Sequence, residues 1–349
     1  MLMRGGTSKG AFFLEEDLPP DTETRDRLLL EIMGSPDPRQ IDGVGGAHPL
    51  TTKVAIVAPS SRDDADLEYL FLQPGVETAT ISDRQNCGNM LAAVGPFALE
   101  RGLLAPEDGP AEVRILMRNT AGIAIASFPV VEGRPVYEGN TSISGVPGTA
   151  AEVGLEFVDV AGSSTGALLP TGNEHDLVEG VDVTLIDNGM PVVVMTADAL
   201  GITGYESCAD LESNEKLRQA LEKIRLASGP MMNLGEVSDL TVPKMTMVAA
   251  PRHGGAVSTR TFIPHRCHDA IGVLGAVSVA TACLLPGSPA AAVARLDAGS
   301  SVISLEHPSG HFDATVTLSF DEGRPRVERA GIIRTARLLM DGVVYPRSY

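Results

Sequence analysis

Two apolar segments constrain the fold of this chain more than any other feature. Residues 90–99 and 271–282 have helical length, and nearly every side chain in both is apolar. A helix that is apolar on every side has to be surrounded by protein. Strands wrapped around each helix are the most economical enclosure, so we expect two buried helices inside sheets.

The rest of the chain favours short strands, because β-branched residues gather between turn-rich segments. Strands are predicted over residues 51–58, 113–117, 123–131, 181–186, 192–195, 244–250 and 315–320. Helices are predicted over residues 22–33, 90–101, 211–227 and 271–285. The expected fold class is therefore α+β.

An approximate internal repeat supports two lobes. Residues 87–92 correspond to 271–276, and Lys53 to Lys244, in the same order and at similar spacing. Chance similarity in Ala- and Gly-rich sequence is the alternative, and duplication is favoured over it. A ligand would then lie between the lobes, facing both helix starts. The predicted domains are 1–175 and 176–336, with residues 337–349 returning to the first lobe.

Charge and composition exclude several classes of partner. The net charge of −18 at pH 7 opposes binding to nucleic acid or to an anionic membrane. The uncharged stretch after Asp269 is interrupted by Pro286 and Gly287, and its apolar part, residues 270–285, is too short to span a bilayer. The cysteines form no C-x-x-C pair and no secretion signal begins the chain, so a reduced, cytoplasmic protein is expected. A small anionic ligand stays compatible with this charge.

Cys87 and Lys53 are the first candidates for chemistry. Cys87 precedes Gly88 at the start of a buried helix, where free N–H groups and the helix dipole favour a thiolate. The alternative is a small buried hydrophobic residue. Lys53 lies in an otherwise apolar strand and either points outward into water or is desolvated enough to act as a base. In one cleft, the two would form a proton-transfer pair.

Three other segments carry polar groups. Residues 3–10, MRGGTSKG, form either an anion-binding turn or a plain hairpin turn. Residues 251–255 and 263–268 concentrate basic groups and favour carboxylate binding. The histidines and cysteine of 263–268 lack the spacing of a metal site, so no metal is expected. The G-x-S-x-G match at 162–166 is not followed by a helix, which excludes a nucleophile elbow.

Several longer segments resemble the PrpF family of isomerases, and together they extend over nearly the whole chain. They are MRGGTSKG, LTTKVAIV, NCGNM, IDNGMPVVVM, PTGN, KMTMVAAPRHGG and FIPHRCHDAIGVLGAVSVATACL. The resemblance implies a diaminopimelate epimerase-like fold of two pseudo-symmetric lobes, each a β-barrel-like sheet around a central apolar helix. Family members usually carry several residues ahead of MRGG, so a longer native first strand is expected.

The resemblance also implies an activity. The segments PRHGG, FIPHRCH and GAVSVATACL are most similar to members that act on 4-oxalomesaconate, a keto-tricarboxylate of gallate and protocatechuate degradation. Isomerisation of 2-methylaconitate is the alternative. The implied reaction moves a proton in a small polycarboxylate without a cofactor, in a possible homodimer. A non-catalytic accessory protein for a dehydratase is the alternative of another class, and it would not need Lys53 or Cys87.

The family's proton-transfer pair falls on Lys53 and Cys87. Diaminopimelate epimerase uses a second cysteine, and the matching position lies near Ile271, so two-cysteine racemisation is disfavoured. Backbone N–H groups at both helix starts would bind carboxylate or dienolate oxygens. The expected substrate-binding residues are Arg4, Thr7, Ser8, Gly88, Asn89, Asn188, Arg266, Gly272, Val273 and Ser309.

Overall fold

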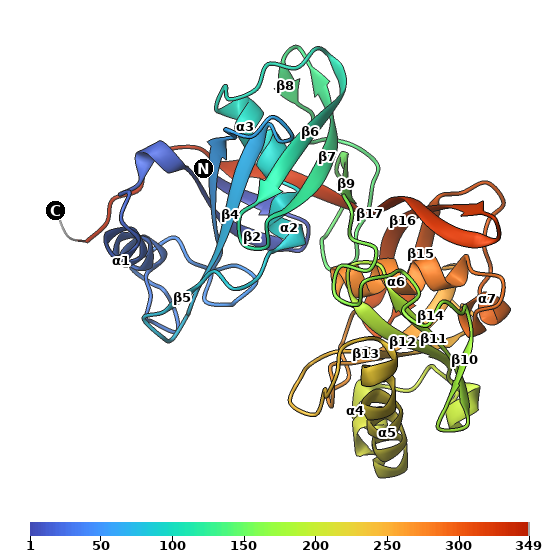
Figure 1. Ribbon diagram of the computed structural model, residues 1–349. Helices are drawn as coiled ribbons and strands as arrows, with labels where there is room; N and C mark the ends of the chain where they lie inside the picture. Colours follow the sequence, from blue (N-terminus) through green and yellow to red (C-terminus); the bar gives the residue numbers. More distant parts are fainter. Residues whose placement is uncertain (348–349) are drawn as a thin grey trace. The chain divides into compact units, whose positions relative to one another are not determined.

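The computed structural model describes residues 1–347 and divides into two compact units (Figure 1). The first lobe consists of Met1–Val158 and the chain from Ile333 onward, and the second lobe of Asp159–Ile332. The predicted boundary at residue 175 therefore lies within the second unit. The segment from Asp159 to residue 175 belongs to the second lobe because Asp187 of β11 accepts hydrogen bonds from the backbone N–H groups of Ser164 and Thr165. The predicted return of 337–349 ends in residues 348–349, which lie outside the described residues.

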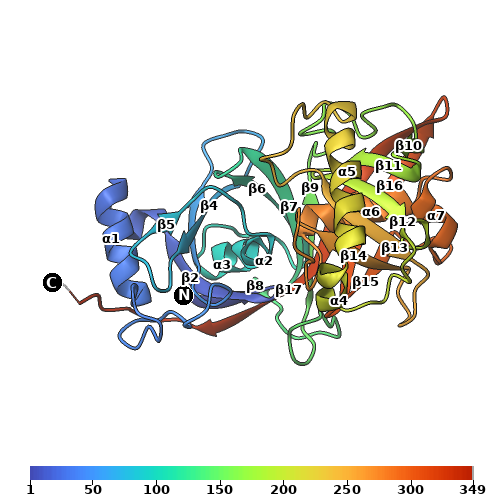
Figure 2. The ribbon, with the colours of Figure 1, turned by 90° about the horizontal axis from the view of Figure 1, so that it is seen from below.

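The strands of the first lobe form a closed ring around a helix, as Figure 2 shows. The ring runs in the order β1 (Leu2–Gly5), β2 (Ser8–Leu14), β3 (Val54–Pro59), β4 (Leu67–Pro74), β6 (Gly109–Met117), β7 (Gly122–Val131), β9 (Glu152–Phe157) and β17 (Arg324–Met340). β17 then pairs with β1 and closes the ring. The pairs β2–β3 and β4–β6 are parallel, and β1–β2, β3–β4 and β6–β7 are antiparallel.

The enclosed helix of the first lobe is broken in two. The prediction of one helix over 90–101 is wrong, because α2 (Gly88–Leu91) and α3 (Val94–Glu100) are separated by a turn. Pro96 explains the break, since it has no N–H for the carbonyl of Ala92 and its ring crowds that carbonyl. The burial was predicted correctly: Phe97 is fully buried, and its ring centroid lies 5.5 Å from that of Phe12.

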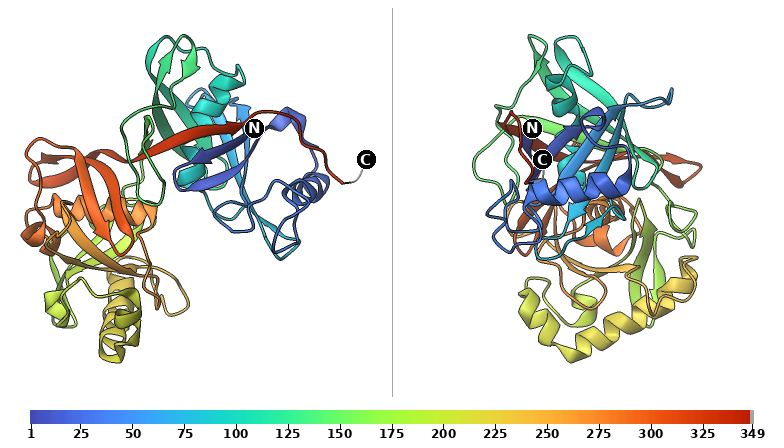
Figure 3. Two further views of the ribbon diagram at one scale, coloured as in Figure 1. Left: turned by 180° about the vertical axis from the view of Figure 1, so that it is seen from behind. Right: turned by 90° about the vertical axis from the view of Figure 1, so that its left-hand side faces the viewer.

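Helix α1 (Thr22–Met33) has the predicted bounds and covers the outer face of the ring, as the right-hand view of Figure 3 shows. Its buried Leu29 and Met33 pack with Val54 and Ile56 of β3. Successive side chains of a strand point to opposite faces. Lys53, directly before Val54, is therefore directed away from α1 and toward the inside of the ring.

The second lobe repeats this pairing. Its row of strands is β10 (Asp176–Val178), β11 (Val181–Asp187), β12 (Pro191–Thr196), β13 (Lys244–Ala249), β14 (Val257–Phe262), β15 (Val302–His307), β16 (Gly310–Asp321) and the first part of β17. As in the first lobe, two pairs are parallel, β12–β13 and β14–β15, with antiparallel pairs between and beside them. The buried helix is α6 (Val273–Cys283). The expected pair of pseudo-symmetric lobes is confirmed.

Shorter elements complete the chain. The helix predicted over 211–227 is two helices, because Asn214 ends α4 (Cys208–Ser213) and caps α5 (Glu215–Met231) by accepting from the backbone N–H of Leu217. The remaining elements are η1 (Glu15–Asp17), β5 (Ile81–Ser82), β8 (Arg134–Pro135), η2 (Asp198–Leu200) and α7 (Pro289–Val293). Within residues 1–347, no helix has the length and apolar character to cross a membrane.

Candidate active site

Lys53 is buried inside the first lobe, with 6 % of its surface exposed. Its Nζ donates a hydrogen bond to Oε1 of Gln73 at 2.7 Å and lies 5.0 Å from the ring centroid of Phe71. The amide of Gln73 is itself fixed, since it donates to the carbonyl of Thr52 at 2.8 Å. The alternative of an outward, solvated lysine is therefore wrong.

Cys87 is the N-cap residue of α2 and is a free, half-buried thiol. Its carbonyl accepts hydrogen bonds from the hydroxyl of Tyr69 at 3.3 Å and from the N–H of Leu91 at 3.0 Å. Burial, and then the nearby Cys87, raise the pKa of Tyr69 well above its ordinary value, so the phenol remains a donor. The small buried hydrophobic role that was the alternative for Cys87 describes Cys283 instead, which is 2 % exposed inside α6.

Strand β4 brings Lys53 and Cys87 to one surface. Tyr69, Phe71 and Gln73 alternate along β4 and therefore share its inward face. Tyr69 contacts the carbonyl of Cys87, whereas Phe71 and Gln73 contact the amine of Lys53. The Lys53 amine and the Cys87 carbonyl at the start of α2 therefore contact neighbouring inward-facing residues of β4.

The segment before Cys87 is tied to the same strand. The side chain of Asn119 accepts from the N–H of Phe71 and donates to its carbonyl, both at 2.9 Å. It also donates to the carbonyl of Asp83 at 2.7 Å. Asn86 donates to Oγ1 of Thr120 at 2.6 Å. These bonds fix the position of Cys87 relative to β4 before any substrate binds.

The turn between β1 and β2 packs against the start of α2. A Cβ atom on Gly5 would lie 2.3 Å from the carbonyl oxygen of Asn89, and Gly6 has a φ of +50°, so both positions require glycine. The side chain of Asn89 donates to Oγ1 of Thr7 at 3.0 Å and accepts from Nε of Arg334 at 3.1 Å. MRGGTSKG and NCGNM are therefore neighbours, and Arg334 joins them from β17.

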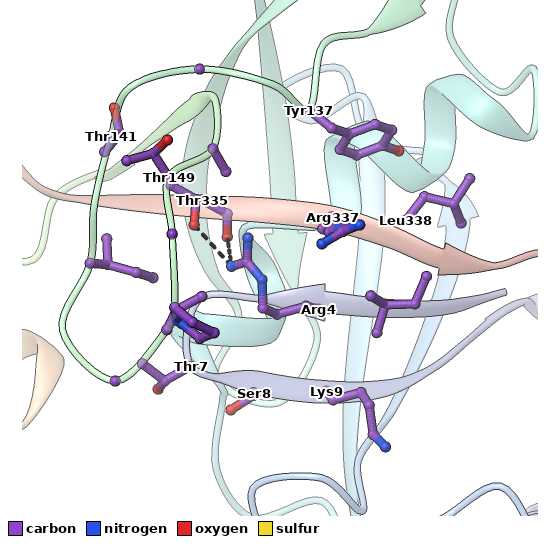
Figure 4. Close-up of a pocket in the computed structure, with 18 of the residues that line it drawn as sticks. Arg4, Thr7, Ser8, Lys9, Tyr137, Thr141, Thr149, Thr335, Arg337 and Leu338 are labelled. Atoms are coloured by element: carbon purple, nitrogen blue, oxygen red, sulfur yellow. Dashed lines mark hydrogen bonds between the residues drawn. The ribbon is translucent and has the colours of Figure 1, made fainter.

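Ser8 and Arg4 lie on opposite faces of the sheet. Ser8 pairs with Gly5, whose face meets α2, whereas Arg4 pairs with Lys9 on the outer face. Ser8 is 1 % exposed, and its hydroxyl has no hydrogen-bond partner among residues 1–347. A buried hydroxyl without a partner is costly, and a ligand oxygen would remove that cost. Arg4 instead donates to the carbonyl and hydroxyl of Thr335 (Figure 4).

Three predicted residues lie at or against the buried helix of the second lobe, where Gly272 and Val273 are partly exposed and Asn188 is buried. Gly272 is the N-cap of α6 and Val273 its first residue, and a Cβ atom on Gly272 would meet no atom within 4 Å. Asn188 is fully buried; its N–H donates to Oγ of Ser278 at 3.0 Å and its amide to Oγ1 of Thr281 at 2.9 Å. Asn188 thus joins the end of β11 to α6.

Two other candidates lie at the surface of the second lobe. The side chain of Arg266 is 82 % exposed and pairs with Glu212 at 2.8 Å. The hydroxyl of Ser309 donates to the carbonyl of Asp269 at 2.6 Å. No group of three or more His, Cys, Asp or Glu residues suited to a metal ion occurs in the described part of the chain.

Sequence patterns did not identify Tyr69, Gln73, Asn119 or Arg334. Their roles depend on which strands are neighbours and in what register. The run LEYLFLQP carried the signal of a strand, since aromatic and branched residues alternate within it. Nothing in that run shows that its inward face meets Lys53.

Known proteins match this chain along almost all of its length. Residues 1–347 match the family described as PrpF protein. The chain is 58 % identical over 345 residues to "4-oxalomesaconate tautomerase" of Pseudomonas putida, covering 99 % of this chain and 94 % of that protein. It is 57 % identical over 346 residues to "(4E)-oxalomesaconate Delta-isomerase" of Novosphingobium sp., covering 99 % and 96 %.

Solved structures agree with the fold. The crystal structure of methylitaconate-delta-isomerase matches with a TM-score of 0.90 at 32 % identity, covering 99 % of this chain and 95 % of that one. A probable proline racemase from Agrobacterium radiobacter matches with a TM-score of 0.50 at 13 % identity, covering 100 % and 94 %, and shows the two-lobed fold alone. By its family match and by these identities, the chain belongs to the PrpF protein family.

Proposed function

We propose that this chain is a cofactor-independent isomerase that moves a proton within 4-oxalomesaconate. The observation that carries the proposal is the convergence of the Lys53 amine and the Cys87 helix start on the inward face of β4. The two relatives at 58 % and 57 % identity, both named for oxalomesaconate, support the choice of substrate.

The reaction needs one base and one acid. A C–H bond beside a carbonyl or a conjugated alkene is acidic, because the resulting dienolate spreads its charge over several atoms. Lys53, as the neutral amine, takes that proton, and the Cys87 thiol returns one at the other end of the conjugated system. Passage of a proton from the Lys53 ammonium to the Cys87 thiolate through solvent then restores both groups. The reverse assignment gives the same net reaction. Each positioned group contributes roughly 10²–10⁴-fold to the rate.

The substrate carboxylates and the dienolate need donors. The first-turn N–H groups of Gly88 and Asn89 and the unpartnered hydroxyl of Ser8 supply them in the first lobe. Thr7 supports this arrangement through its bond from Asn89. In the second lobe we assign the same function to the N–H groups of Gly272 and Val273, with Arg266 and Ser309 as further contacts. Asn188, expected to bind substrate, is fully buried and donates to Ser278 and Thr281, so it positions α6 instead.

The test is a direct assay of the purified chain with 4-oxalomesaconate. We expect a change in ultraviolet absorbance and uptake of solvent deuterium, with both signals lost in Lys53→Met and in Cys87→Ser. Full activity in both variants would contradict the mechanism. A larger kcat/KM on 2-methylaconitate would transfer the same mechanism to that substrate, and binding of a dehydratase without turnover would favour the accessory role.

A further inference from the structure

A cavity of about 760 Å³ lies on the outer face of the first lobe, away from the buried helix. Its floor is formed by β17, β1 and β2, and residues 137–150 arch over it (Figure 4). The proposed chemistry uses the inward face, where Gly5 and Ser8 lie against α2. Thr7 and Ser8 of the turn between β1 and β2 line its edge, whereas Lys53, Cys87 and α2 are not among its lining residues, so the cavity lies apart from the catalytic pair.

Three cationic side chains form a row across this floor. Arg337 of β17 is directly opposite Arg4 of β1, which is directly opposite Lys9 of β2. Like charges in cross-strand register destabilise a sheet. None of the three forms an ion pair within residues 1–347, although the chain as a whole carries a net charge of −18. Glu138, the acidic residue that lines the cavity, also makes no ion pair there.

Arg4 is fixed by hydrogen bonds from its Nη1 and retains N–H groups that are available to a ligand. Its Nη1 donates to the carbonyl of Gly6 and to both oxygens of Thr335, at 2.9–3.0 Å. Its Nε and Nη2 donate to no residue in the described part of the chain, and a guanidinium has five N–H groups. Burial, and then Arg337, lower the pKa of Arg4, and an anion in the cavity would oppose both effects.

The arch is an ordered part of the first lobe. Thr141 and Ala150 exchange two backbone hydrogen bonds of 3.0 Å, and the N–H of Ala151 donates to the carbonyl of Tyr137 at 2.9 Å. Thr141 and Thr149 of the arch also line the cavity. Guanidinium donors, with hydroxyl groups available in the same cavity, are suited to carboxylate or phosphate oxygens.

We propose that this outer cavity binds a small multivalent anion, a polycarboxylate or a phosphate, through Arg4, Lys9 and Arg337. The site is separate from the catalytic pair and goes beyond the proposed function. It also assigns Arg4 to this ligand in place of the isomerase substrate.

Isothermal calorimetry tests the site with two probes, tricarballylate and inorganic phosphate, at constant ionic strength. Lys9→Gln/Arg337→Gln is expected to weaken binding of at least one probe by tenfold or more. It should leave the kcat of the isomerase within twofold in the absence of the probe. Lys53→Met is expected to retain the affinity of this outer site, which separates the proposal from the fate of the proposed function. The preferred probe distinguishes a carboxylate from a phosphate ligand.

The matched control is Lys216→Gln/Arg295→Gln, which removes the same charge from exposed positions of the second lobe and should bind as the parent does. Equal affinity in Lys9→Gln/Arg337→Gln and the parent, or no binding to the parent, would overturn the proposal. If only Lys53→Met loses binding of a probe, that probe binds in the catalytic site, and the proposal of an outer site is overturned too. A change of oligomeric state in Lys9→Gln/Arg337→Gln would show that the cationic row contacts a second copy of this chain, which would overturn the proposal of an anion site. If that variant does not fold, exposed Arg337→Gln alone provides the comparison.

Discussion

The two lobes share one order of strand pairings and differ at the start of the enclosed helix. In the first lobe, Lys53 is buried against Gln73, and Cys87 caps the helix. In the second lobe, Lys244 begins the corresponding strand, donates to the carbonyl of Thr241 at 2.7 Å and is only partly buried, and Gly272 caps the helix. The difference teaches that the same scaffold occurs in both lobes, whereas the proposed chemistry requires a thiol and a buried amine that only the first lobe has at these corresponding positions.

The largest expected effect separates the two lysines. Lys53→Met should lower kcat by about 10²–10⁴-fold, because it removes the proposed base. Lys244→Met should leave kcat within twofold, since its amine serves a surface carbonyl. Steady-state kinetics on both variants, with thermal unfolding as the folding control, measures the contrast. Equal losses in the two variants would break the comparison between the lobes.

In the second lobe, we expect the buried side chain of Arg225 to stabilise the fold. Arg225 is fully buried and donates to both carboxylate oxygens of Glu222, at 2.7 and 2.8 Å, and to the carbonyl of Val237 at 2.8 Å. Arg225→Met should lower the free energy of unfolding by about 3–5 kcal/mol, because these acceptors lose their donor. Urea unfolding measures the change, with exposed Arg218→Met as control. A loss below 1 kcal/mol would contradict this role.

Replacing a glycine by alanine should change stability in opposite directions at Gly5, which packs against α2, and at Gly275, which lies within α6. Gly5→Ala places a Cβ atom 2.3 Å from the carbonyl oxygen of Asn89, so we expect a loss of about 1–3 kcal/mol and reduced activity. Gly275→Ala in α6 meets no atom within 4 Å and should gain up to about 1 kcal/mol from helix propensity. Thermal unfolding of the two variants measures both changes in stability. A Gly5→Ala variant as stable as the parent would show that the turn between β1 and β2 can shift to accommodate the added methyl group.

The smallest effect concerns thiol labelling. Burial raises the pKa of the Cys208 and Cys267 thiols and raises that of Cys283 to about 12, so these thiols stay protonated at pH 8. Iodoacetamide at pH 8 is expected to modify Cys87 first, as followed by mass spectrometry of peptides. Earlier labelling of a second-lobe cysteine would remove the distinction between the lobes.

The sequence predicted the burial of both apolar segments, because a segment without a polar face has to be enclosed by protein, but it did not predict the break between α2 and α3. It also placed Cys87 at a helix start, because that depends on a local pattern, and it placed Lys53 within a strand that in the structure begins one residue later, at Val54. Strand β14 was missed because its Arg260 is buried by a distant contact, donating to the carbonyl of Glu206. Strand β17 was missed because its first residues are charged. The contacts of Gln73 depend on strand register, which local patterns do not carry.

One strand has a consequence for how the chain is made. β17 leaves the second lobe at Ile332 and completes the first, where Ala336 and Met340 pair with β1, as the left-hand view of Figure 3 shows. During synthesis, the lobe that is translated first therefore waits for nearly the last codons before its ring can close. A ribosome that stops shortly before residue 333 would release a finished second lobe attached to an open first one, so the half with the proposed chemistry is the last to mature.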